Sequence, residues 1–103
     1  MDRQALPLLE KAVALAQEQA APKHAMGLLL VRRGQLDDAI APLKSAAQAE
    51  PQNYRYSYVY AVALWEAGRQ EDAIEVLESA LQRLPGNREL ISALASYYQQ
   101  RGE

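Results

Sequence analysis

The chain has 103 residues, with 11 basic and 13 acidic side chains and a formal net charge of −2. This balance excludes the strongly basic surface that holds a nucleic-acid backbone, and the absence of cysteine excludes disulfides, thiolate catalysis and cysteine-ligated metal. The longest apolar stretch, residues 25–31, is too short to span a membrane, and Glu10 and Lys11 interrupt the early apolar run that a signal peptide would need. We therefore expect a soluble protein, whose compartment the sequence does not specify.

Six helices are predicted along the chain, because the composition is rich in alanine and leucine and contains no phenylalanine. They are expected near residues 3–18, 22–33, 37–50, 54–67, 71–84 and 88–101. Pro22 fits the first turn of the second helix, and Pro42 fits the second turn of the third, where it can bend the helix. The fold class is therefore all-α.

The sequence repeats itself at an offset of 34 residues. The matched pairs are Gly34 with Gly68, Ala39 with Ala73, Ile40 with Ile74, Leu43 with Leu77, Ala46 with Ala80 and Pro51 with Pro85. A fixed period of this length is typical of a solenoid of helical hairpins. The glycines stand where a first helix should end, and the prolines where a second helix should stop. At the same register the opening segment carries second-helix residues, namely Ala5, Leu6, Leu9 and Ala12.

These residues resemble the tetratricopeptide repeat family, whose 34-residue pattern is W-x2-L-G-x2-Y, then A-x3-F, then P. The matching residues are Met26, Gly27, Leu30, Ala39, Leu43 and Pro51 in the first full repeat and Tyr60, Ala61, Leu64, Ala73, Leu77 and Pro85 in the second. Lys23 and Ser57 stand where the family has tryptophan. The resemblance implies one domain over residues 1–103, a right-handed α-solenoid with full repeats at 20–53 and 54–87, a second helix at 1–19 and a first helix at 88–103.

The resemblance also implies that the first helices line a concave groove in which a protein or peptide partner lies. Within the helix at 54–67, Tyr54, Tyr58, Val62 and Trp65 share one stripe, beside the core stripe. The predicted partner-binding residues over all first helices are His24, Leu28, Val31, Arg32, Arg55, Tyr58, Val62, Trp65, Ser92, Ser96 and Gln99. Aromatic side chains at such positions can anchor a partner. The alternative, that Trp65 and its neighbours pack into the core, stays open.

Two details narrow the kind of partner. Arg32 and Arg55 could each hold a carboxylate of the partner through a bidentate contact, or could be ordinary solvated surface charges. The carboxylate clamp with which some members of the family hold chaperone tails is absent, because its slots carry His24, Leu28, Val59, Glu89 and Ala93.

The leading hypothesis is thus a non-catalytic protein-interaction module without cofactor or metal. His24 is the single histidine and has no cysteine, serine or aspartate partner in register, and no phosphate-binding loop or metal-ligand spacing occurs. The second hypothesis is a structural segment that assembles with a sister chain or a larger protein through Leu6, Leu9 and Val13. In that context residues 56–64, which read YSYVYAVAL, are similar to repeat tails of bacterial multihaem cytochrome-type proteins, although no haem-attachment motif occurs.

Overall fold

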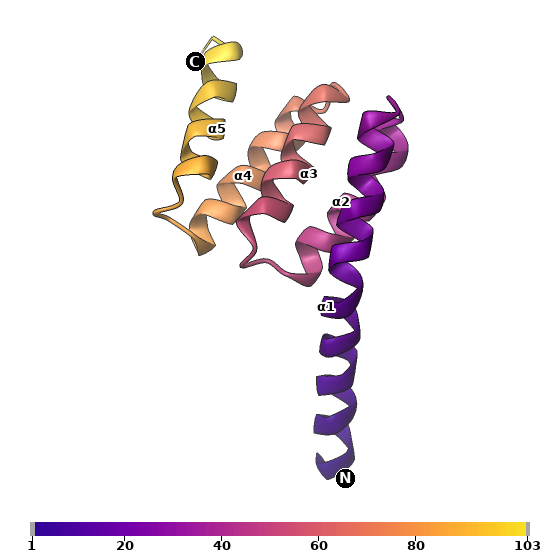
Figure 1. The fold of residues 1–103 in the computed structure, drawn as a ribbon. Coiled ribbons are helices and arrows are strands. Elements are labelled where there is room, and N and C mark those ends of the chain that lie inside the picture. Colours follow the sequence, from indigo (N-terminus) through magenta and orange to yellow (C-terminus); the bar gives the residue numbers. More distant parts are fainter. Residues whose placement is uncertain (1, 103) are drawn as a thin grey trace.

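The computed structural model describes residues 2–102, with the side chains of Lys11, Leu15 and residues 18–102. It contains five α-helices, and no strand occurs in these residues. The helices are α1 (Asp2–Arg32), α2 (Leu36–Ala49), α3 (Tyr54–Glu66), α4 (Gln70–Arg83) and α5 (Arg88–Gln100) (Figure 1). The predicted all-α class is confirmed.

Each helix packs against the next one in the chain, and α5 also contacts α3 (Figure 1). The C-terminal half of α1 and α2 form the first hairpin, and α3 and α4 form the second hairpin. Stacking of consecutive hairpins in one direction is the arrangement of a helical solenoid, in which each unit contacts only its neighbours.

The helix map differs from the prediction at one place. The break expected between residues 18 and 22 is absent, so α1 is one helix of 31 residues and the predicted repeat boundary at 19/20 lies inside it. Residues 12–21 consist of alanine, valine, leucine, glutamine and glutamate, which favour a helix and include no capping residue that would start a new one. Pro22 removes one backbone hydrogen bond at a cost of about 3 kcal/mol, and these helix formers offset it.

Turns inside the hairpins depend on glycine. Gly34 and Gly68 end α1 and α3 with positive φ angles of 75° and 87°. In both turns the residue after the glycine donates its backbone N–H to the carbonyl of Leu30 or Leu64, at 2.8 Å. This is a Schellman motif, which requires the left-handed conformation that glycine adopts without strain.

Turns between the hairpins depend on asparagine and proline. The side chain of Asn53 accepts a hydrogen bond from a backbone N–H of α3 at 3.2 Å, and that of Asn87 accepts one from α5 at 3.0 Å. Pro51 and Pro85 stand two residues before these caps and prevent the second helices from continuing. The two turn types therefore repeat at the same offset as the sequence.

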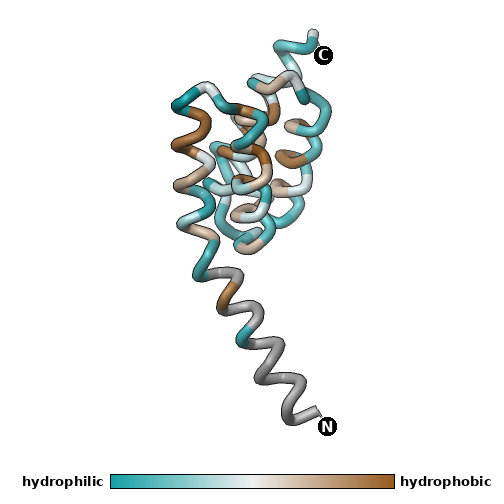
Figure 2. Tube along the Cα trace, turned by 90° about the vertical axis from the view of Figure 1, so that its right-hand side faces the viewer, coloured by the Kyte–Doolittle hydropathy of each residue, from teal (hydrophilic) through white to brown (hydrophobic). Residues whose placement is uncertain are grey.

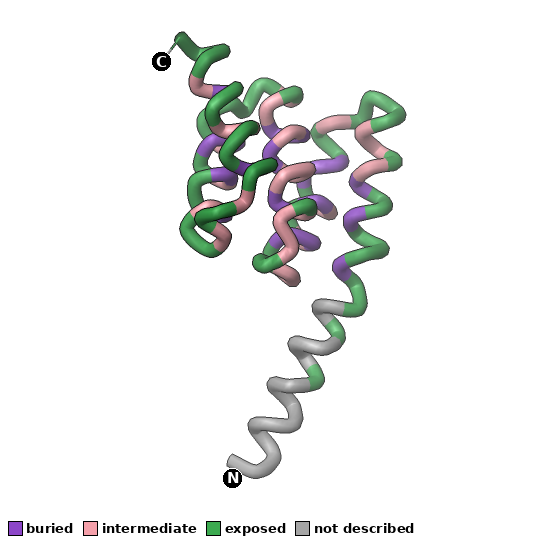
Figure 3. Tube along the Cα trace, turned by 60° about the vertical axis from the view of Figure 1, so that its left-hand side comes forward, coloured by how far each residue is buried: buried purple, intermediate pink, exposed green. Residues whose placement is uncertain are grey.

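The core runs along the inside of the stack (Figure 3, purple). Its buried residues are Ala39, Ile40, Leu43, Ala61, Ala63, Leu64, Ala73, Ile74, Leu77, Ala80, Leu90 and Tyr97. Small residues stand where two helices cross closely. Gly27 is the clearest case, because a Cβ added to it would collide with the side chain of Leu43. In the second hairpin the same two positions hold Ala61 and Leu77, both fully buried.

Candidate functional site

Three of the predicted partner-binding residues line one open hollow. Tyr58 of α3 and Ser92 and Ser96 of α5 border a hollow of about 490 Å³ between these two first helices. The other residues that line it are Arg88, Glu89, Ala93 and Tyr97. The hollow is therefore bordered by an aromatic ring from each helix, by small polar side chains of α5, and by two side chains of opposite charge at the start of α5.

Trp65 lies at the junction between α3 and α5. Its ring stacks on that of Tyr97, with a centroid distance of 4.0 Å and an angle of 5° between the planes. Burial, followed by the neighbouring Tyr58 hydroxyl and Glu66 carboxylate, raises the pKa of Tyr97 to about 12. Trp65 is half-buried and packs against the core, so one face of its ring is covered and only the remainder is accessible to a partner.

His24 lies at the preceding junction, between α1 and α3. It is buried, and its ring centroid is 4.5 Å from that of Tyr56. Burial, and secondarily the charge of Arg55, lowers the pKa of His24, and Nδ1 has no hydrogen-bond partner among the described residues. His24 is therefore a packing residue in its neutral form, with little surface to offer a partner.

The remaining predicted residues do not line the α3–α5 hollow. Leu28, Val31 and Val62 are half-buried. Arg32, Arg55 and Gln99 are exposed. The predicted assembly residues Leu6, Leu9 and Val13 have side chains outside the described part of the chain.

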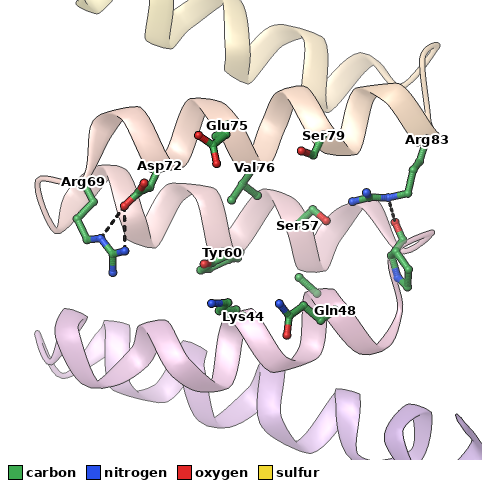
Figure 4. A pocket seen from close by; sticks show the side chains of 12 residues that line it. Lys44, Gln48, Ser57, Tyr60, Arg69, Asp72, Glu75, Val76, Ser79 and Arg83 are labelled. Carbon is green, nitrogen blue, oxygen red and sulfur yellow. Dashed lines mark hydrogen bonds and ion pairs between the residues drawn. The ribbon is translucent and has the colours of Figure 1, made fainter.

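A second groove, which sequence reasoning missed, lies between the second helices α2 and α4 over α3 (Figure 4). It has a volume of about 530 Å³ and is lined by Lys44, Ala47, Gln48, Pro51, Ser57, Tyr60, Arg69, Asp72, Glu75, Val76, Ser79 and Arg83. At one end Arg69 makes an ion pair with Asp72 at 2.9 Å, and at the other Arg83 donates a hydrogen bond to the carbonyl of Pro51 at 3.3 Å. The charged ends of the groove are thus already paired within the chain.

The signal for this groove was present in the sequence. Lys44, Gln48, Glu75 and Ser79 place polar side chains on the second helices at helical spacing. The family resemblance points to the first helices, so it does not indicate a groove between second helices.

Among the described residues, no group of three or more histidine, aspartate and glutamate side chains could hold a metal ion. None of the helices in this part of the chain combines the length and apolar character that crossing a bilayer requires.

The family model of the tetratricopeptide repeat matches residues 24–88, which span the first hairpin and the second. The chain belongs to the tetratricopeptide repeat family. Members of this family are in general scaffolds for protein interaction, and the repeat is typically non-catalytic. No curated protein matches the chain significantly.

Solved structures of MamA share this repeat fold. A MamA mutant with an arginine replaced by glutamate matches with a TM-score of 0.68 and 30% identity, over 97% of this chain and 73% of its own. A second structure of MamA, AMB-1, matches with the same TM-score and identity, over 97% and 59%. A third, with an aspartate replaced by lysine, has a TM-score of 0.67 at 30% identity, over 97% and 55%. The chain thus spans roughly half to three quarters of these MamA chains.

Proposed function

We propose that this tetratricopeptide repeat unit binds an extended peptide segment of a protein partner in the hollow between α3 and α5. The observation that carries the proposal is that Tyr58 of α3 lines one open hollow with Ser92 and Ser96 of α5, which follow it by 34 and 38 residues in the sequence. The similarity to MamA and the general scaffold role of the family support it.

The chemistry of the hollow suits an extended peptide. Tyr58 is half-buried and offers aromatic surface that an apolar side chain of the partner can cover, while the buried Tyr97 forms the floor beside it. The exposed hydroxyls of Ser92 and Ser96 can exchange hydrogen bonds with the peptide backbone, which a peptide without secondary structure leaves unpaired. Arg88 and Glu89 are exposed at the start of α5, where Arg88 can pair with an acidic side chain of the peptide and Glu89 with a basic one.

The affinity of a single hollow of this size is expected to be modest. Only a few anchors offset the loss of translational freedom and the ordering of the peptide, so we expect a Kd in the micromolar range, which corresponds to about −8 kcal/mol.

The test begins with a random peptide library displayed on phage and selected on the intact chain. Selected peptides are then titrated into ¹⁵N-labelled protein, and amide shifts are mapped. We expect the largest shifts around Tyr58, Ser92 and Ser96. Shifts that gather instead at Lys44, Gln48 and Ser79 would place binding in the α2–α4 groove and overturn the proposal.

A matched pair of variants tests the location of the peptide site by measuring the affinity for a selected peptide. Ser92→Tyr fills the α3–α5 hollow, and Ser79→Tyr places the same ring in the α2–α4 groove, both from exposed serines. The expected result is at least about a tenfold loss of affinity for Ser92→Tyr and little change for Ser79→Tyr. The reverse order contradicts the proposal.

A further inference from the structure

The face of α1 that points away from α2 carries apolar side chains that nothing in the described structure covers. Met26 is 56% exposed and Leu29 is 44% exposed, and with Pro22 they define the outer face of α1. Steps of three, four and seven residues return to one side of a helix, so Leu15, 55% exposed, continues this face toward the N-terminus. Figure 2 shows apolar residues in brown along the last turns of α1.

The next repeat shows what normally covers this face. At the 34-residue offset Met26 corresponds to Tyr60 and Leu29 corresponds to Ala63 of α3. Ala63 is only 2% exposed. Tyr60 is half-buried and borders the same groove as Ala47 of α2, the second helix that precedes α3 in the stack. Among the described residues, therefore, no second helix packs on the outer face of α1 in the way that α2 packs on α3.

Residues 2–19 carry, at the same register, the small and apolar residues of a second helix such as α2. Ala5, Leu6, Leu9 and Ala12 occupy the register positions of Ala39, Ile40, Leu43 and Ala46 in α2, and Val13 occupies that of Ala47. In this structure the segment continues α1 in one helix. Two parts of one uninterrupted helix cannot pack side by side, so the segment cannot cover the outer face of its own α1.

We propose that the outer face of α1 is covered by residues 2–19 of a second copy of the chain, and that two copies exchange these segments reciprocally. In the dimer, residues 2–19 of one copy pack against α1 of the other copy, as α2 packs against α3 within one chain. A reciprocal exchange closes on itself, so it yields a dimer in which the outer face of α1 is covered in both copies. This proposal is independent of peptide binding between α3 and α5.

The first test is the molar mass of the intact chain by sedimentation equilibrium over a dilution series. We expect a dimer, with a dissociation constant that Leu29→Glu raises at least about tenfold. Ile91→Glu is the matched control, because Ile91 of α5 is similarly exposed at 47% but lies on another face, and it should leave the dissociation constant within about twofold. A monomer at all concentrations, or a dimer that Leu29→Glu does not weaken, overturns the proposal.

The second test uses the absence of cysteine in the chain. Val13 and Met26 correspond by register to Ala47 and Tyr60, which border one groove. A Val13→Cys chain mixed with a Met26→Cys chain should form a disulfide-linked dimer under mild oxidation, whereas Val13→Cys mixed with Ile91→Cys should not. An intramolecular disulfide in the Val13→Cys/Met26→Cys double variant, with no linked dimer, shows that the segment folds back on its own chain and overturns the exchange.

Discussion

The first and second hairpins have the same register but differ in the residues at their helix crossing and in what covers them. Gly27 faces Leu43 in the first hairpin, while Ala61 and Leu77 hold the same positions in the second. Ala63 is buried in α3, whereas its counterpart Leu29 on α1 is exposed. The comparison shows that the repeat determines which residues face inward within a hairpin, whereas burial of the outer face depends on the neighbouring unit.

The junctions between consecutive first helices differ in the same way. His24 and Tyr56 meet at a tilt of 34° between α1 and α3, while Trp65 and Tyr97 lie almost parallel between α3 and α5. Both contacts join helices of neighbouring units through aromatic rings, but only the first contains a histidine, whose pKa is lowered by burial.

The largest expected effect tests whether the two hairpins share one core. Leu43 and Leu77 are both fully buried in the same cluster, so Leu43→Ala and Leu77→Ala should each lower the free energy of unfolding by about 3 kcal/mol. Urea denaturation followed by circular dichroism gives the values. Ile91→Ala, on the surface, is the control and should cost less than about 1 kcal/mol. Two separate transitions, with only one moved by each variant, would mean that the hairpins unfold independently.

The next effect tests the tight crossing of the first hairpin. Gly27→Ala adds a methyl group where Leu43 leaves no room, and we expect a net loss of about 1–2 kcal/mol, because overpacking exceeds the gain in helix propensity. The control is Gly86→Ala, where an added Cβ meets nothing within 4 Å. Leu43→Val should recover part of the loss in the Gly27→Ala background. A Gly27→Ala variant more stable than the parent would contradict the close approach.

A smaller effect tests the two types of turn. Asn87 caps α5 through its side chain, whereas Gln35, at the corresponding end of α2, makes no capping hydrogen bond. Asn87→Ala should therefore cost about 1 kcal/mol and Gln35→Ala less than about 0.5 kcal/mol. Thermal unfolding measures both. Equal costs would show that the asparagine side chain is not what holds the turn between hairpins.

The smallest effect concerns pH. The pKa of His24 lies below its usual value of 6.5 because the ring is buried and Arg55 is near. The unfolded chain therefore binds a proton more readily, so the contribution of neutral His24 to stability is complete above pH 6.5 and is lost as the pH falls through the lowered pKa. NMR titration of the single histidine should give a midpoint below 6.5, and His24→Phe should remove this part of the pH dependence. A midpoint at or above 6.5 would contradict the burial.

Much of this fold could be predicted because the signals are local. Matching glycines, prolines and apolar residues at one offset located α2 to α5 within one residue at each end. The continuity of α1 could not be predicted in the same way. The register placed a break near Pro22, while the strength of the helix formers before it decides whether the chain turns there.

The candidate site was less predictable, because it depends on contacts between units. A helical projection grouped Tyr58 with Trp65, but whether a ring faces solvent depends on the residue opposite, and Tyr97 lies 32 positions further along the chain. Lys44 of α2 and Glu75 of α4 likewise border one groove only because the stack brings two second helices together, which no projection of a single helix can show.

The parallel stack of Trp65 on Tyr97 gives the junction between α3 and α5 its own optical signal. Two rings held face to face in an asymmetric setting produce near-ultraviolet circular dichroism, and Trp65 is the sole source of tryptophan fluorescence. Because α5 packs against α3 and α4, its detachment erases that signal while the backbone signal of the two hairpins persists. Fraying from this end of the solenoid can therefore be followed as a separate event, without adding any label to the protein.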